Sequence, residues 1–248
     1  MLLAKPESPQ ETANDLDGQI MTFWRVLRDR PEEFIRACAL TPHSRAELQQ
    51  AREDTDDELE MARRVWVQLA QGRAGRWNTT GWKYIIGSAG MPIPEILDGF
   101  VERMAGCAAR LRHVSLECLP AVDLVKRYGT SPDVLIYADP PYLIGSHEGR
   151  MDASGYKVAM ADELSHRELA MALNEAKASV VLSGYAHPLY DQELYAGWSR
   201  VELHTFTGNG LLRDGNGTAE QGRRVEVLWS NRPLLGAPRK QMVRQADT

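Results

Sequence analysis

A carboxylate, two prolines and a tyrosine follow one another where an apolar segment ends. The stretch VLIYADPPYLIG (134–145) runs from β-favouring residues into Asp139, Pro140, Pro141 and Tyr142. Proline has no backbone N–H and a fixed φ, so the two prolines remove two hydrogen-bond donors and stiffen the turn. The carboxylate and carbonyl oxygens that remain can accept both hydrogens of an amino group, and the Tyr142 ring can stack on a base. We therefore predict that these four residues form a catalytic site for an exocyclic amino group.

The second half of the chain alternates between strand and helix patterns. Strands are expected at 114–119, 133–138 and 178–185, helices at 121–129 and 160–177, and two antiparallel strands at 198–207 and 223–231. Repeated β-α units predict an α/β fold whose sheet is mostly parallel, with an antiparallel strand pair at the C-terminal end. Ligands of such sheets bind at the carboxyl ends of the strands, which is where Asp139 falls.

The first half is mainly helical. A short strand ends at Asp15, and a helix starts after Gly18, breaks near Pro31 and resumes to about Leu40. Residues 45–72 continue with helical periodicity, residues 72–94 have the Gly, Thr, Asn and Pro content of a loop or hairpin, and residues 94–113 form a further helix.

Charge is segregated along this part of the chain, although the net charge of the whole is only −5. Residues 45–60 are rich in Asp and Glu, whereas residues 61–83 carry Arg and Lys without an acid. Arginine and lysine bind phosphates, and arginine or asparagine can read base edges. A solvated helix face with a core tryptophan at Trp66 is the alternative. The residues that we expect to contact DNA are Arg63, Arg64, Arg73, Arg76, Trp77, Asn78 and Lys83.

Composition sets broad limits on the class of protein. No run of 18 apolar residues occurs, and the N-terminal residues turn polar too early for a signal peptide, so a cytoplasmic protein is expected. Cys38, Cys107 and Cys118 form no Cys-x-x-Cys pair, so neither a zinc site nor a disulfide framework is expected.

The sequence resembles the DNA adenine-N6 methyltransferases, particularly those of phages and prophages. The resemblance rests on NDLDGQIMTFWRVLRD, YGTSPDVLIYADPPYL, DELSHRELAMALNEAKASVVLSGYAHPLYDQEL and RRVEVLWSN, in the family's order. It implies a Rossmann-like sheet, S-adenosyl-L-methionine as the methyl donor, and double-stranded DNA from which the target adenine is flipped. Asp15 then matches the acid that binds the ribose of the cofactor, and Asp139 belongs to the same site.

The resemblance also implies a division of the chain and a place in the cell. Residues 1–40 and 114–231 would form the catalytic domain, residues 41–113 a helical target-recognition insert, and residues 232–248 a flexible tail. The expected setting is a bacterial or phage-infected cell, with or without a paired restriction enzyme.

One family feature is not found where the pattern requires it. An aromatic-x-Gly-x-Gly loop should precede the ribose acid by about 20 residues. The Gly-Asn-Gly segments at 208–210 and 215–217 follow a late strand instead. Three explanations are open: a second chain supplies the loop, the chain is an inactive remnant, or the start was assigned at an internal methionine. A non-catalytic DNA-binding or regulatory subunit is the corresponding alternative function.

Overall fold

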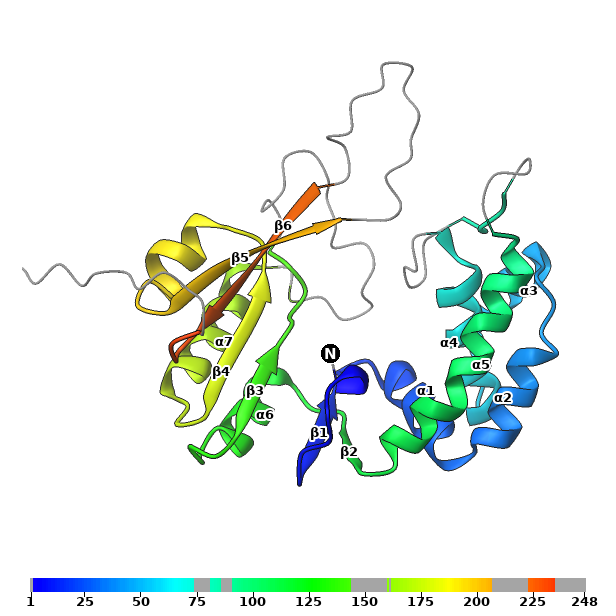
Figure 1. The fold of residues 1–248 in the computed structure, drawn as a ribbon, viewed down its shortest axis with the longest axis horizontal. Coiled ribbons are helices and arrows are strands. Elements are labelled where there is room, and N and C mark those ends of the chain that lie inside the picture. Colours follow the sequence, from blue (N-terminus) through cyan, green and yellow to red (C-terminus); the bar gives the residue numbers. More distant parts are fainter. Residues whose placement is uncertain are drawn as a thin grey trace, which may run out of the picture. The chain divides into compact units, whose positions relative to one another are not determined.

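The computed structural model describes residues 2–73, 81–85, 91–143, 160, 162–206 and 223–234 (Figure 1). The described chain divides into two compact units, which meet in sequence between Ala121 and Val122. The first unit is mainly helical and includes a pair of parallel strands. The second unit is a four-stranded mixed sheet with helices. The molecule is therefore mixed α/β, as the sequence predicts.

The first unit gathers its helices around one hydrophobic core. After the short 3-10 helix η1 (Leu2–Ala4) and strand β1 (Glu11–Asn14) come the helices α1 (Gly18–Asp29), α2 (Pro31–Ala39), α3 (Arg45–Gln50), α4 (Glu58–Gln71) and α5 (Ile93–Leu111), then strand β2 (Val114–Glu117). The core includes Phe34, Val67 and Leu111, which are almost completely buried on α2, α4 and α5. Each amphipathic helix thus buries its apolar stripe against the others.

Polar capping side chains or prolines set where the helices of this unit begin. The Asp17 carboxylate accepts hydrogen bonds from the backbone N–H groups of Gln19 and Ile20 and caps α1. Pro31 occupies the first turn of α2, where its missing N–H costs nothing, and this confirms the predicted break.

The predicted helical run over residues 45–72 is wrong in one respect: it is two helices. The acidic segment between them leaves the helix because Asp and Thr side chains compete for backbone N–H groups. Thr55 Oγ1 accepts a hydrogen bond from Asp57 N, and the Asp57 carboxylate caps α4 by accepting one from Glu60 N.

The second unit contains α6 (Ala121–Tyr128), β3 (Leu135–Ala138), α7 (Glu163–Glu175), β4 (Ser179–Gly184), the π-helical turn η4 (Leu189–Leu194), β5 (Ser199–Phe206) and β6 (Arg223–Ser230). The strand order is β3-β4-β6-β5. β3 and β4 are parallel, whereas β6 is antiparallel to both of its neighbours. The predicted antiparallel pair of C-terminal strands is confirmed.

The two faces of this sheet are covered unequally in the described chain. Leu182 pairs with Trp229 in register, and both side chains are buried. Tyr190 of η4 packs edge-on against Trp229, and its hydroxyl lies 2.7 Å from Nδ1 of His166 on α7. On the other face, Leu135 and Tyr137 are exposed. Because side chains alternate along a strand, the face that carries Tyr137 is also the face to which Asp139 belongs.

The observed division differs from the expected one, in which residues 1–40 accompany residues 114–231 and residues 41–113 are an insert. In the structure, α1 and α2 share one core with α4 and α5. Phe23 and Leu27 of α1 and Phe34 of α2 are among the residues that build it. Of the predicted tail, residues 235–248 lie outside the described residues.

Candidate functional site

The end of β3 places Asp139 at the carboxyl edge of the parallel pair. β3 stops at Ala138, so Asp139 is the first residue beyond the strand, and its side chain is exposed. No described residue donates a hydrogen bond to the carbonyls of Pro140 and Pro141, which remain available as acceptors. The turn therefore presents a carboxylate and carbonyl oxygens at the edge where parallel sheets bind ligands.

Ser183, at the end of the neighbouring strand, orients the Asp139 carboxylate. The register aligns Tyr137 with Val181, so Asp139 and Ser183 come two residues later on the same face. Ser183 Oγ donates a hydrogen bond of 2.8 Å to Asp139 Oδ1. The serine is 4% exposed, and its hydroxyl also lies 3.3 Å from Ala138 O, a longer contact than the one to Asp139. One carboxylate oxygen is thus engaged, and Oδ2 has no hydrogen-bond partner among the described residues.

Tyr142 is held against a second tyrosine. Its ring centroid lies 4.5 Å from that of Tyr185, at an interplanar angle of 72°. Partial burial, followed by the charge of Asp139, raises the pKa of Tyr142 well above its usual value. The phenol therefore stays neutral over the physiological pH range and offers an uncharged aromatic surface beside the carboxylate.

Asp15 follows β1 in the first unit, and its carboxylate is exposed. Asp15 Oδ1 accepts a hydrogen bond of 2.8 Å from Asp17 N, which is the geometry of an Asx-turn. Partial desolvation raises the pKa of Asp15, and the neighbouring Asp17 carboxylate adds to that effect. The carboxylate has further lone pairs, with which it can accept from a hydroxyl of a vicinal diol.

An asparagine fixes the edge on which Asp15 stands. The Asn14 side chain donates 3.0 Å to Leu119 O and accepts 2.9 Å from Leu119 N. These two hydrogen bonds join the ends of β1 and β2 beyond their parallel register. The edge that carries Asp15 is therefore held by side-chain as well as backbone hydrogen bonds.

Arg63 and Arg64, both expected to contact DNA, are engaged within the helical unit. Arg63 pairs with Glu47 and Glu60, and its side chain is only 15% exposed. Arg64 pairs with Glu60 at 2.7 Å and donates to the backbone carbonyls of Glu53 and Asp54. These guanidinium groups hold α3, α4 and the loop between them together, so in this structure they serve the packing of the unit and are not part of a solvated face.

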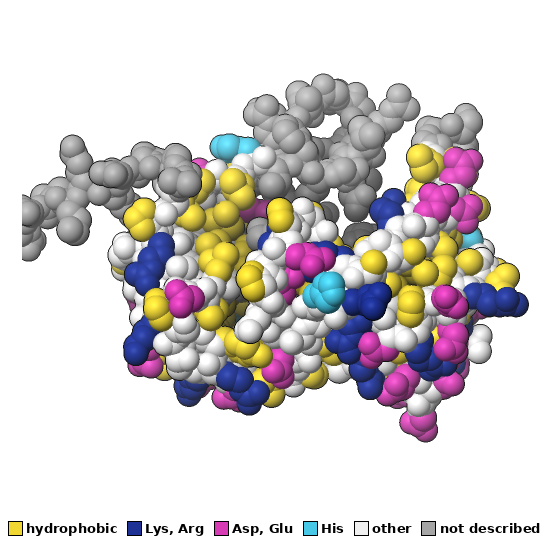
Figure 2. All heavy atoms as spheres, turned by 60° about the horizontal axis from the view of Figure 1, so that its bottom comes forward, with side chains coloured by type: hydrophobic (Ala, Val, Ile, Leu, Met, Phe, Trp, Pro, Cys, Tyr) yellow, Lys and Arg dark blue, Asp and Glu magenta, His cyan; other side chains and the backbone are white. Residues whose placement is uncertain are grey.

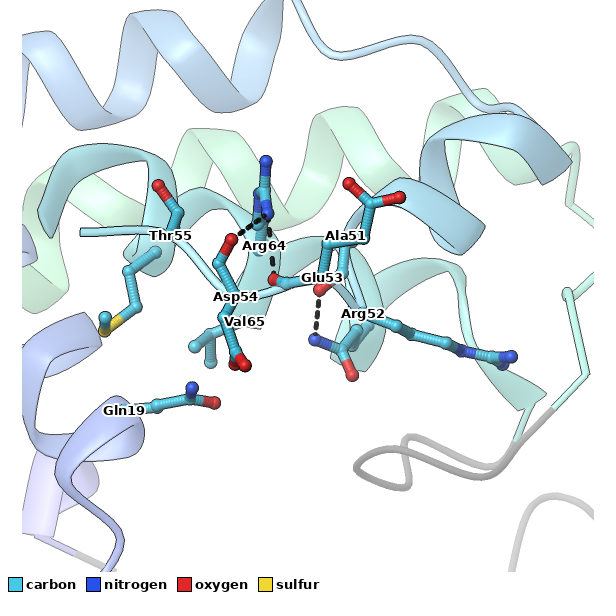
Figure 3. Close-up of a pocket in the computed structure, with 10 residues that line it drawn as sticks. Gln19, Ala51, Arg52, Glu53, Asp54, Thr55, Arg64 and Val65 are labelled. Atoms are coloured by element: carbon cyan, nitrogen blue, oxygen red, sulfur yellow. Dashed lines mark hydrogen bonds between the residues drawn. The ribbon is translucent and has the colours of Figure 1, made fainter. Parts of the chain in front are cut away.

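The same contacts line a surface pocket in the helical unit (Figure 3). It is a shallow depression open to solvent, and Gln19, Arg52 and Thr55 are among its walls. The dashed lines in Figure 3 mark Arg64 bound to the loop carbonyls and Gln68 bound to Ala51 O at 2.6 Å. Arg64 and Gln68 thus serve mainly to hold the α3–α4 loop in place.

Two of the expected DNA-contacting residues lie on a described hairpin. Gly72 and Trp82 form an antiparallel bridge, so the predicted loop or hairpin is confirmed as a hairpin in its described part. Arg73 is exposed, and Lys83 is half-buried. The other three expected contacts, Arg76, Trp77 and Asn78, lie outside the described residues.

On the face drawn in Figure 2, Lys and Arg side chains are interspersed with Asp and Glu side chains over the helical unit. The arginines that could bind a nucleic acid are therefore those that no carboxylate engages.

The residues that sequence reasoning missed are positioning residues. Ser183 stands in the segment SGY (183–185), whose place at the end of a strand parallel to 133–138 was a usable signal. Asn14 had no such signal, because its partner Leu119 lies 105 residues away.

Neither membrane-spanning helices, metal sites nor the comparisons with families and curated proteins point to a function. No helix among the described residues is long and apolar enough to cross a membrane, and no group of three or more His, Cys, Asp or Glu side chains in that part of the chain could hold a metal ion. No protein-family model matches the sequence, and no curated protein matches it either.

Proposed function

We propose that this protein is a site-specific DNA methyltransferase that transfers a methyl group from S-adenosyl-L-methionine to the N6 amino group of adenine. The observation that carries the proposal is the turn after β3. There Asp139, held by Ser183, stands beside proline carbonyls without described donors and beside the neutral ring of Tyr142. Acceptors without competing donors, next to an aromatic surface, suit an amino group on a flat base.

The chain's own residues would act by orientation. Asp139 and the Pro140 carbonyl accept hydrogen bonds from the two N–H groups of the adenine, which directs the nitrogen lone pair out of the ring plane. S-adenosyl-L-methionine, when bound, would supply a sulfonium methyl group for in-line displacement, with S-adenosyl-L-homocysteine as the leaving group. The methylated nitrogen then gives up one proton to solvent. Tyr142 stacks on the flipped base and offsets part of the few kcal/mol that extrusion costs. Positioning and electrostatics then lower the barrier, and no covalent enzyme intermediate is needed.

The fold that suits this function is a Rossmann-like methyltransferase sheet. The parallel pair β3-β4, extended by the antiparallel strand β6, supports this assignment. Asp15 at the end of β1 would bind the ribose hydroxyls. We place the protein in the cytoplasm of a bacterial or phage-infected cell, as part of a DNA methylation or restriction-modification system.

We further propose that cofactor binding needs a glycine-rich loop that the described residues do not supply, contributed by a complementing chain or by an added N-terminal segment. β3 pairs only with β4 among the described residues, so its other edge offers unpaired backbone groups. Methylation by residues 1–248 alone, at a rate that an upstream extension does not increase, would disprove this requirement.

Asp139→Ala should abolish methylation and change DNA affinity less than about twofold, because the carboxylate acts on the amino group and carries none of the phosphate binding. Methylation is measured with the extended or complemented protein and an adenine-containing duplex, and DNA affinity by fluorescence anisotropy. Undiminished methylation by the variant would remove Asp139 from the mechanism.

A catalytically inactive DNA-binding or regulatory subunit is the second candidate, favoured by the location of the Gly-x-Gly segments far from Asp15. Calorimetric titration with S-adenosyl-L-methionine separates the two. Saturable binding by the extended or complemented protein supports the enzyme. Absence of binding there, with DNA affinity intact, supports the subunit.

A further inference from the structure

Two arginines lie over aromatic rings on the surface of the helical unit. His43 stacks on Trp82 with ring centroids 4.4 Å apart, and Trp82 stacks on Tyr84 at 5.9 Å, each pair inclined by only 21°. The Arg45 guanidinium carbon lies 4.9 Å from the Trp82 centroid and 6.0 Å from the Tyr84 centroid. The Arg73 guanidinium carbon lies 5.0 Å from the Tyr84 centroid. We call these five residues the arginine–aromatic stack.

Backbone hydrogen bonds hold the hairpin part of the stack in place. Arg73 N donates 2.8 Å to Gly81 O, and Lys83 N donates 2.7 Å to Gln71 O. The bridge between Gly72 and Trp82 lies between these two bonds. The rings of Trp82 and Tyr84 therefore project from a paired backbone.

A buried glutamine anchors the other part of the stack. Gln71 is fully buried at the end of α4, donates 2.9 Å to Pro42 O and accepts 3.1 Å from Ser44 N. The His43 ring nitrogen Nε2 lies 2.9 Å from Lys83 O. Segment 42–45 is thus fixed to the end of α4 and to the hairpin, so that Arg45 is held beside the rings.

The two guanidinium groups are arranged to bind an anion. A guanidinium that lies over a ring has its face covered, and its N–H groups point outward in its own plane. Arg45 and Arg73 are both exposed, and no carboxylate among the described residues pairs with either of them. This is the opposite of Arg63, which two glutamates engage.

Both arginines border the same tyrosine ring. Their guanidinium carbons lie 6.0 Å (Arg45) and 5.0 Å (Arg73) from the Tyr84 centroid. Because the two groups border one ring, they can bind phosphates that lie close together on one strand. Each guanidinium can bind a phosphate through two parallel hydrogen bonds.

We propose that the arginine–aromatic stack is a clamp for the phosphodiester backbone of duplex DNA, with Arg45 and Arg73 as the phosphate ligands. The choice of duplex DNA as the polyanion rests on the proposed function. Arg45 is a DNA contact that the sequence did not predict, because it lies in the acidic segment 45–60. Trp82 and Tyr84 are the rings that orient the two arginines.

The test is the salt dependence of DNA binding, measured by anisotropy with a labelled duplex and without methyl donor. Replacing both arginines (R45Q/R73Q) should make the slope of log affinity against log salt less negative by about 2, since each phosphate contact contributes ~0.9. Affinity at moderate salt should fall at least ~10-fold. The matched control is R36Q/R112Q, which removes two exposed arginines of the same unit from α2 and from the end of α5, and its slope should equal that of the unchanged protein.

A second variant tests the rings. Tyr84→Leu keeps both charges but removes the surface on which Arg73 lies, so affinity should fall a few-fold with an unchanged slope. An unchanged slope in R45Q/R73Q, an equal loss in R36Q/R112Q, absence of DNA binding by the unchanged protein, or equal affinity for polyglutamate would each overturn the clamp. Because methylation is not the readout, loss of binding in R45Q/R73Q supports the clamp even if the protein methylates nothing. Methylation together with an unchanged slope would retain the enzyme and reject the clamp.

Discussion

Ser183 is the residue that gives Asp139 a defined direction. An exposed carboxylate alone samples several rotamers, and a buried hydroxyl at 2.8 Å selects those in which Oδ1 faces β4. Oδ2 is then presented away from that hydrogen bond. The role of Ser183 is to position Asp139, and it need not touch the substrate.

Ser183→Ala should lower the kcat of methylation by about 10-fold and leave the KM for DNA nearly unchanged, because only the orientation of the carboxylate is lost. Steady-state kinetics on the active, extended or complemented protein measure both constants. Ser183→Thr retains the hydroxyl and should recover most of the rate. Equal losses in the alanine and threonine variants would show that the site tolerates no change at this position for reasons of packing.

At the scale of elements, an ion pair of Arg63 with Glu47 joins α3 to α4, and Arg63 also pairs with Glu60. Hydrogen bonds from Arg63, reinforced by Arg64, hold the pKa of Glu60 at about 2 against an ordinary value of 4.5. A carboxyl whose pKa is lower in the folded state stabilises the fold above its unfolded pKa. That stabilisation is lost as the pH falls from about 4.5 towards 2.

Glu60→Gln should therefore reduce the free energy of unfolding by about 1–2 kcal/mol at pH 7, a modest value because the ion pair is partly open to solvent. Near pH 2 the reduction should be much smaller, because Glu60 is then largely protonated. Urea unfolding followed by circular dichroism at a series of pH values measures this. Glu102→Gln, on an exposed position in the middle of α5, is the control and should change the free energy of unfolding by less than about 0.5 kcal/mol. A loss for Glu60→Gln that is the same at all pH values would exclude this ion-pair origin.

The sequence predicted the elements better than it predicted their partners. Pro31 as a helix break, the hairpin closed by Gly72 and Trp82, and the antiparallel strands β5 and β6 follow from local rules on proline, glycine and alternation. The split between α3 and α4 was missed, because helical periodicity on both sides masked the capping residue Asp57.

Side-chain partners depend on what lies far away in the sequence. Arg63 and Arg64 were expected to bind DNA because residues 61–83 carry no acid, yet the carboxylates that engage them come from Glu60, one position earlier, and from Glu47. A linear count of charge cannot register a contact that the packing of α3 on α4 creates. The Asp139–Ser183 contact could be predicted in part, because both residues lie at the ends of strands that were expected to be parallel.

At the scale of the whole molecule, the division into two units was the least predictable feature. Hydrophobic periodicity identified which faces of α1 and α2 are buried, but it did not say against which surface. Phe34 is completely buried in the core that α2 shares with α4 and α5. The second unit has buried residues of its own, including Leu173 on α7 and Trp229 on β6.

Because each unit has its own buried residues, we expect the two units to unfold in two transitions. Phe34→Ala should destabilise the first unit by about 3–5 kcal/mol and Leu173→Ala the second by about 2–5 kcal/mol, since each leaves a cavity. Differential scanning calorimetry of the full chain should show each variant lowering the midpoint of a different transition. Met171→Ala removes a side chain from α7 that is 60% exposed, so it should move neither midpoint by more than a degree or two. A single transition that both core variants lower together would mean that the two units unfold as one cooperative body.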